Sequence, residues 1–204
     1  MSRPRRFPGV SGFVLAGGAS RRMGVEKAGL PIGPERMLDR QIRLLRAVCR
    51  SVSIIGPAQR FAGAGIPVYE DEIPGQGPLG GIHTGLRRAR TEFSLFLSCD
   101  MPLLEERFLR YLCEQALTSR ALATLPPPWA KGRYPLCAVL RRRLLARVRS
   151  CLASGQNQVG RFLSKCRPRT ISKAELAHER FSPRIFCNLN TPEQYEKVRQ
   201  QLAL

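Results

Sequence analysis

The first half of the chain alternates between short apolar runs and segments with helical periodicity. The apolar runs that predict buried strands are residues 12–16, 52–55, 66–69, 93–97 and 121–125. The segments between them that predict helices are 36–50, 82–90 and 104–118. Strands that alternate with helices at this spacing indicate an α/β fold with a mostly parallel central sheet.

The second half is less regular, and the alternation ends at Pro126-Pro127-Pro128. Its predicted elements are a strand at 133–140, helices at 141–154 and 159–165, and strands at 169–172 and 185–188. Thr191-Pro192-Glu193-Gln194 combines a cap, a first-turn proline and a glutamine at the third position, so a last helix is expected to begin there and run to about residue 202.

Segment 70–81 is rich in glycine and proline, which predicts irregular structure. Residues 1–11 are basic and are expected to form a flexible tail, and residues 12–204 are expected to form a single domain, since the chain is long enough for a sizeable core. No apolar run approaches the roughly 20 residues that span a bilayer, and no long apolar segment follows the basic start. Neither a membrane span nor a secretory signal is expected.

Seven cysteines and a net charge of +19 change this picture little. The cysteines are scattered and none forms a C-x-x-C, which fits free thiols in a reducing cytoplasm. The arginines are spread along the chain, and basic residues do not alternate with aromatic ones. We therefore expect no nucleic-acid partner; the alternatives are solvated arginines, or a field that attracts anionic small molecules or an acidic protein.

A glycine-rich turn follows the first predicted strand. Gly17 and Gly18 come first, then Arg21, Arg22 and Lys27. Glycines let a ligand approach the backbone closely, and cations at the rim suit a polyphosphate. The spacing matches neither the dinucleotide-binding G-x-G-x-x-G nor the Walker A loop. The competing interpretation is an ordinary glycine turn with solvated arginines.

Candidate ligand-binding residues follow three of the predicted strands. They lie in this glycine turn, in the loop that contains Asp71, and in the loop that contains Asp100. In parallel α/β sheets, ligands bind at the carboxyl ends of strands, so we expect the three to meet there. Asp100 is then a candidate Mg²⁺ ligand, with a helix cap as the alternative. Asp71 is a candidate for a ribose hydroxyl or a metal-bound water, with a turn carboxylate as the alternative.

These residues suit phosphoryl or nucleotidyl transfer, which needs positioning and charge neutralisation rather than covalent catalysis. Lys27, Arg22 and Arg21 offer the cations, and Asp100 offers the metal ligand. Nothing indicates a Ser–His–Asp triad. His83, His178 and Cys99 are interpreted as structural, the cysteine as part of the core.

Taken together, the motifs resemble those of the nucleoside-triphosphate transferases, and within them the molybdenum cofactor guanylyltransferase family. The motifs that carry the resemblance are Leu15-Ala16-Gly17-Gly18, Arg21-Arg22-Met23-Gly24 with Glu26-Lys27, Gly77-Pro78-Leu79-Gly80-Gly81, Cys99-Asp100-Met101-Pro102 and Asn188-Leu189-Asn190-Thr191-Pro192-Glu193. They extend from residue 12 to about residue 202. The resemblance implies a Rossmann-like, three-layer α/β/α fold and transfer of GMP from GTP to Mo-molybdopterin, with Mg²⁺ as cofactor.

The resemblance also implies roles for individual residues. Those expected to bind the nucleotide are Leu15, Ala16, Gly17, Gly18, Lys27, Asp71 and Asp100. Those expected to catalyse transfer are Lys27, Asp100 and Arg22, with Asp100 and Asn190 holding the metal. Those expected on the pterin side are Arg133, Tyr134, Asn188 and Asn190.

Two positions depart from the family pattern: Glu26 stands where Asp is frequent, and the region near Gly56 lacks a polar residue often used for the nucleotide. The alternatives are a related transferase that uses CTP or a sugar phosphate, and a non-catalytic cofactor-docking protein; Gly17-Gly18 favours GTP. The resemblance further implies a cytoplasmic monomer that makes transient contacts with cofactor-delivery proteins or apo-molybdoenzymes.

Overall fold

The computed structural model of the chain describes residues 6–17, 27–128 and 136–202. A seven-stranded sheet forms its centre, with the strand order β5-β4-β1-β6-β8-β7-β9. The strands are β1 (Phe7–Leu15), β4 (Cys49–Ile55), β5 (Val68–Tyr69), β6 (Phe93–Ser98), β7 (Ala123–Leu125), β8 (Cys137–Arg141) and β9 (Arg169–Thr170). A hairpin of β2 (Pro31–Ile32) and β3 (Glu35–Arg36) lies apart from this sheet.

The sheet is mostly parallel, as predicted. Strands β5, β4, β1 and β6 all run in one direction. Strand β8 is antiparallel to both of its neighbours, β6 and β7, and β9 is parallel to β7. The sheet therefore has a parallel half and a mixed half.

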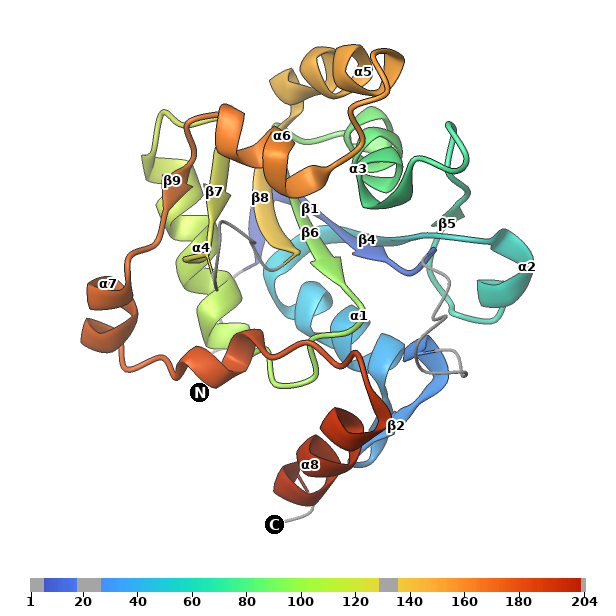
Figure 1. Cartoon of the computed structure of the whole chain (residues 1–204), viewed down its shortest axis with the longest axis vertical. Coiled ribbons are helices and arrows are strands. Elements are labelled where there is room, and N and C mark those ends of the chain that lie inside the picture. The colour runs from blue at the N-terminus through green and yellow to red at the C-terminus, as the bar shows by residue number, and fades with distance from the viewer. Residues whose placement is uncertain (1–5, 18–26, 129–135, 203–204) are drawn as a thin grey trace.

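Helices cover both faces of the sheet and give the expected three layers (Figure 1). The helices are α1 (Met37–Val48), α2 (Ala58–Phe61), α3 (Gly77–Arg88), α4 (Glu106–Thr118), α5 (Leu145–Ala153), α6 (Val159–Lys165), α7 (Lys173–His178) and α8 (Pro192–Leu202). Three short 3₁₀ helices are η1 (Lys27–Gly29), η2 (Arg142–Leu144) and η3 (Pro183–Phe186). Helices α1 and α4 pack on one face, and α3, α5 and α6 on the other.

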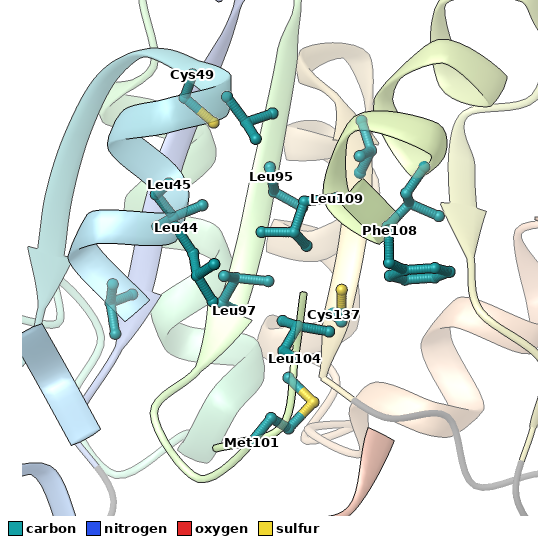
Figure 2. Close-up of a cluster of buried hydrophobic side chains, with 14 of the residues drawn as sticks. Leu44, Leu45, Cys49, Leu95, Leu97, Met101, Leu104, Phe108, Leu109 and Cys137 are labelled. Carbon is teal, nitrogen blue, oxygen red and sulfur yellow. The ribbon is translucent and has the colours of Figure 1, made fainter. Parts of the chain in front are cut away.

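The core follows from the alternation of side chains along β1. Val10 and Val14 point to α1 and α4, whereas Phe13 and Leu15 point to α3. Figure 2 shows the first of these two layers between sheet and helices. The side chains that meet there include Leu44, Leu45, Leu95, Leu97, Met101, Leu104, Phe108 and Leu109.

The buried cysteines of this same layer include Cys49 and Cys137. All seven cysteines of the chain are free thiols. Burial raises the pKa of the Cys49 thiol to about 12 and also raises the pKa of Cys137. Thiols that stay protonated are poor nucleophiles, so these two act as small apolar side chains.

Helix α3 begins at Gly77, so the prediction of irregular structure up to residue 81 was wrong. Pro78 is tolerated in the first turn, where its missing N–H costs no hydrogen bond. Glycine is required where the helix touches the sheet: a Cβ on Gly85 would lie 2.4 Å from Cε1 of Phe96, and one on Gly81 would lie 3.0 Å from Cδ2 of Leu15. The glycines let α3 lie close on the strands.

Other elements also differ from the predictions. Residues 7–11 do not belong to a flexible tail, because β1 begins at Phe7, which pairs with Cys49 and packs against the core. The predicted strand at 185–188 was wrong: η3 ends at Phe186, whose ring packs edge-on against Phe108. Helix α7 was missed, although Ser172 and Glu175 form a capping box that could have revealed it.

In the part of the chain that the structure describes, no helix is both long enough and apolar enough to cross a membrane.

Candidate active site

A cavity of about 470 Å³ opens at the carboxyl ends of β1, β4 and β6. Its described lining residues are Leu15, Gly17, Lys27, Ile55, Asp71, Gly75, Gly77, Pro78, Gly81, Ser98, Cys99, Asp100 and Leu136. The start of the glycine turn, the loop with Asp71 and the loop with Asp100 thus share one cavity. The predicted convergence at the strand ends is confirmed.

Lys27, Asp100 and Asn190 form the polar centre of the site. Nζ of Lys27 lies 3.6 Å from Oδ2 of Asp100 and donates a hydrogen bond to Oδ1 of Asn190 at 3.1 Å. The side chains of Lys27 and Asp100 are each only 16% exposed. Partial burial reduces solvent screening, so this ion pair holds the lysine more firmly than a surface pair would.

The loop after β6 holds Asp100 in place. Gln41, fully buried on α1, donates from Nε2 to the carbonyl of Met101 at 2.8 Å. Its neighbour Arg40 donates from Nε to the carbonyl of Pro102. The backbone N–H of Leu189 donates to the carbonyl of Asp100 at 2.8 Å. Helix α1 and the segment before α8 therefore fix this loop from two sides.

Asn190 is positioned by a separate small apolar cluster. Leu189 is fully buried against Ile32, Met37 and Val198, so it ties α8 to the β2-β3 hairpin (Figure 1). The backbone N–H of Asn190 donates to Oε1 of Gln194 at 2.7 Å. These contacts leave the Asn190 side chain available to accept the hydrogen bond from Lys27.

Asp71 lies beside the start of the glycine turn. Its Oδ2 would be 3.7 Å from a Cβ built on Gly17. Burial raises the pKa of the Asp71 carboxyl above its usual range. The next residue is anchored to α3: the N–H of Glu72 donates to Oγ1 of Thr84 at 3.0 Å, and the Glu72 carboxylate lies 3.2 Å from Nε of Arg87. These contacts fix the direction of the Asp71 loop.

Several side-chain oxygens in this region are buried without a hydrogen-bond partner among the described residues. They include Oδ1 of Asp71, Oδ1 of Asp100 and Oδ1 of Asn188. A buried oxygen left unpaired is costly, so each requires a partner such as an ion, water or substrate. Carboxylate and amide oxygens are the donors that Mg²⁺ prefers, and this cation is usually held by only one or two protein carboxylates. The residues present therefore fit a divalent cation.

Across the described ranges, no group of three or more histidine, cysteine, aspartate or glutamate side chains could hold a metal. That part of the chain therefore offers no candidate for a structural metal site of this kind. A single carboxylate such as Asp100 instead fits a metal ion that is also bound by substrate phosphates.

Comparison with known proteins agrees with this geometry. The MobA-like NTP transferase domain matches residues 12–170. Molybdenum cofactor guanylyltransferase of Syntrophotalea carbinolica is 35% identical over 94% of this chain and 91% of that protein. The probable molybdenum cofactor guanylyltransferase of Carboxydothermus hydrogenoformans is 31% identical over 94% of this chain and 95% of that protein.

The chain belongs to the molybdenum cofactor guanylyltransferase family. As a member of that family it is a nucleotidyltransferase. Its fold is also that of a solved structure, molybdopterin-guanine dinucleotide biosynthesis protein A of Archaeoglobus fulgidus, with a TM-score of 0.81. The match covers 95% of this chain and 98% of that one at 18% identity, and it shows the fold.

Most of the site residues predicted from the family motifs lie together. Leu15, Gly17, Lys27, Asp71 and Asp100 line the cavity. The Ala16 side chain instead packs in the core, while its N–H donates to the carbonyl of Ile55. The predicted residues Gly18, Arg22, Arg133 and Tyr134 lie outside the described residues.

Some residues of the site were not singled out beforehand. Leu136 lines the cavity, and Gln41 holds the Asp100 loop from below. Neither residue belongs to a motif. A single leucine, or a single glutamine on a helix, carries no sequence signal that indicates a role at a site. Cys99 was interpreted as core, but it is only partly buried and also lines the cavity.

His83 does not line this cavity among its described residues. It is buried in α3, where its Nδ1 lies 4.0 Å from Oε2 of Glu72. Burial lowers the pKa of His83, which favours the neutral ring. A neutral, packed imidazole agrees with the structural interpretation.

Proposed function

We propose that this protein transfers GMP from GTP to the terminal phosphate of Mo-molybdopterin, giving the guanine dinucleotide form of the cofactor. A phosphate oxygen of Mo-molybdopterin forms a bond to the α-phosphorus of GTP. The bond from that phosphorus to the bridging oxygen breaks, and pyrophosphate leaves. The observation that carries the proposal is the convergence of Gly17, Lys27 and Asp100 in one cavity, with Asn190 bonded to the same lysine, in a chain of this family.

Each residue has a defined task in the proposal. Leu15 and Gly17 give the nucleotide a close backbone approach. The Lys27 ammonium binds the phosphates and offsets the negative charge that grows on the leaving group. The Asp71 carboxylate accepts a hydrogen bond from a ribose hydroxyl of the nucleotide. Arg22, from the turn, assists Lys27 in catalysis, and Gly18 and Ala16 complete the set of residues proposed to bind the nucleotide.

Asp100 and Asn190 are the proposed holders of Mg²⁺, which supplies charge neutralisation at the phosphates when bound. The unpaired Oδ1 of Asp100 supports this assignment. In this arrangement Asp100 also orients Lys27, because the two side chains already form an ion pair.

The pterin side is proposed to be formed by Asn188, Asn190, Arg133 and Tyr134. Leu136 lines the cavity directly after the segment that contains the last two, which supports this placement. We also propose that the enzyme works as a monomer in the cytoplasm and makes transient contacts with delivery proteins or apo-molybdoenzymes; a sedimentation experiment tests the oligomeric state.

The deciding experiment incubates the purified protein with Mo-molybdopterin, Mg²⁺ and one nucleoside triphosphate at a time. Mass spectrometry should detect the guanine dinucleotide product with GTP and no product with CTP. Formation of the cytosine dinucleotide product without the guanine dinucleotide product would contradict the proposal.

Lys27→Ala should reduce the rate about 10²- to 10³-fold in a folded protein, because a preorganised positive charge at the phosphates is lost. Lys165→Ala, on α6, removes the same charge away from the cavity and should leave the rate unchanged. A non-catalytic docking protein would instead retain its role in both variants.

A further inference from the structure

A second cavity, of about 720 Å³, lies at the other end of the sheet. It is lined by residues of β1 and β4 that extend from their starts past their middles, by Pro67 and Tyr69 at β5, and by residues at and after the end of α3. The candidate active site opens at the carboxyl ends of these same strands. The two cavities therefore occupy opposite edges of the sheet.

Hydroxyl groups form the floor of this second cavity. Its described lining includes Ser11, Ser51, Ser53 and Thr91. Ser51 donates to Oγ of Ser11 at 3.2 Å, and the Ser11 and Thr91 hydroxyl oxygens are 2.8 Å apart. Parallel strands covered on both faces are normally almost continuously apolar, so a row of hydroxyls at this place calls for a polar ligand.

Ser53 is the least expected member of the row. The residue is only 8% exposed, it lines the cavity, and its hydroxyl takes part in none of the hydrogen bonds that the described residues form. A hydroxyl at the cavity wall is both a donor and an acceptor for a ligand that enters the cavity.

Three arginines surround the hydroxyls: Arg50, Arg88 and Arg90. Arg50 and Arg90 form no ion pair with any described residue. Arg88 stacks over the ring of Tyr69, with 5.2 Å between its Cζ and the ring centroid, and lies 3.0 Å from Oε1 of Glu72. None of the described lining residues carries a carboxylate. The cavity is thus positively charged and rich in donors.

We propose that this second cavity binds a small phosphate-bearing anion. Guanidinium groups recognise phosphate oxygens with paired N–H donors, and hydroxyls complete the coordination of such a group. The volume falls within the range of small-molecule sites and admits either inorganic phosphate or a nucleoside monophosphate. This binding is independent of the proposed transfer reaction.

The test measures binding of inorganic phosphate and of adenosine 5′-monophosphate by isothermal titration calorimetry, without added Mg²⁺. The protein carries Lys27→Ala, so that phosphate groups are not held by the lysine of the first cavity. Circular dichroism and thermal unfolding confirm that each variant is folded.

Saturable binding of either probe is expected. Arg50→Ala combined with Arg90→Ala should weaken it at least about tenfold, and Ser53→Ala about threefold to tenfold, because hydrogen bonds to a charged group are lost. The matched control combines Arg120→Ala with Arg184→Ala, two exposed arginines outside the cavity lining, and should bind as the parent does. Tighter binding of the monophosphate identifies a nucleotide as the ligand, and equal or tighter binding of phosphate identifies the inorganic anion.

The proposal is overturned if neither probe binds saturably, or if removal of Arg50 and Arg90 leaves binding unchanged. It is also overturned if the control pair weakens binding as much, since the general charge of the protein would then explain the effect.

Discussion

The parallel half of the sheet and its mixed half contribute to the candidate active site in different ways. Gly17, Asp71 and Asp100 each follow a parallel strand closely, so short chain segments carry their positions from the core to the cavity. Asn188 and Asn190 come after the mixed half, in a loop between η3 and α8, and Asn190 contacts Lys27 from there. One set depends on the main core, and the other on a small cluster around Leu189.

The difference predicts where the site tolerates change. Groups at strand ends share the stability of the central sheet, whereas Asn190 depends mainly on the small cluster between the hairpin, the start of α1 and α8. Local stability varies across a fold, and elements with few buried contacts open most readily. The asparagine segment should therefore be the part of the site that can be loosened without unfolding the protein.

The largest effect is expected from the charged group at the strand end. Asp100→Asn keeps the shape of the side chain but removes the charge that faces Lys27, and it should lower the transfer rate at least about 100-fold. Asn190→Ala should lower it only about tenfold to 100-fold, since it removes a neutral partner of the same lysine. Steady-state rates of both folded variants give the comparison; equal losses would remove the distinction between the two halves.

Truncating Leu189 in the small apolar cluster should show whether transfer activity depends on that cluster or only on the overall stability of the protein. Leu189→Ala and Leu163→Ala both truncate buried leucines and should each lower the free energy of unfolding by about 2–5 kcal/mol. Only Leu189→Ala should also reduce transfer, because Leu163 lies on α6, away from the site. The rates are measured well below both unfolding temperatures. If both variants keep full activity, Asn190 does not depend on the cluster.

The close contact of α3 with the sheet should be sensitive to a single methyl group. Gly85→Ala would place a Cβ 2.4 Å from the buried ring of Phe96, so the free energy of unfolding should fall by about 1–3 kcal/mol. Gly63→Ala is the matched control, since its Cβ would meet no atom within 4 Å. Chemical denaturation of both variants measures the difference. A stable Gly85→Ala variant would mean that α3 can move away from the strands at little cost.

The smallest effect concerns an ion pair in the mixed half. The Arg169 guanidinium, with the Ser172 N–H, lowers the pKa of the Glu175 carboxyl to about 2, below its ordinary value. A carboxyl whose pKa is lowered on folding stabilises the protein above its unfolded pKa of about 4.3, and that contribution is lost as pH falls toward 2. The side chain is 31% exposed, so screening reduces the contribution to about 1 kcal/mol.

Glu175→Gln should therefore be about 1 kcal/mol less stable than the parent at pH 7, with the difference disappearing as pH approaches 2. Glu114→Gln, an exposed change on α4, should show no difference at either pH. Denaturation curves at several pH values test this, and a difference that does not depend on pH would contradict it.

The parallel half could be predicted from the sequence because its signals are local. Apolar runs identify the strands, and the rule that ligands bind at the carboxyl ends of strands predicts that Asp71 and Asp100 lie close together. Helix α3 shows the limit of this reasoning. Glycine and proline usually break helices, and only the closeness of Phe96 and Leu15 explains why they are needed in this one.

The mixed half could not be predicted in the same way. Strand β8 inserts antiparallel between β6 and β7, and no spacing in the chain specifies that insertion. The expected strand near Phe186 is a 3₁₀ turn because two adjacent buried residues fit a turn as well as a strand. The contact of Asn190 with Lys27 joins residues 163 positions apart, and only the family motifs led to it.

That long separation has a consequence for the order in which the protein becomes functional. Chains are synthesised from the amino terminus, and early segments can fold while later ones are still being added. The strand-end groups, Asp100 among them, are made well before residue 190, yet the asparagine that accepts a hydrogen bond from Lys27 arrives only with that residue. A nascent chain could therefore hold a folded sheet and still lack this second contact to its lysine, so catalytic competence should appear late in translation rather than grow with the length of the chain.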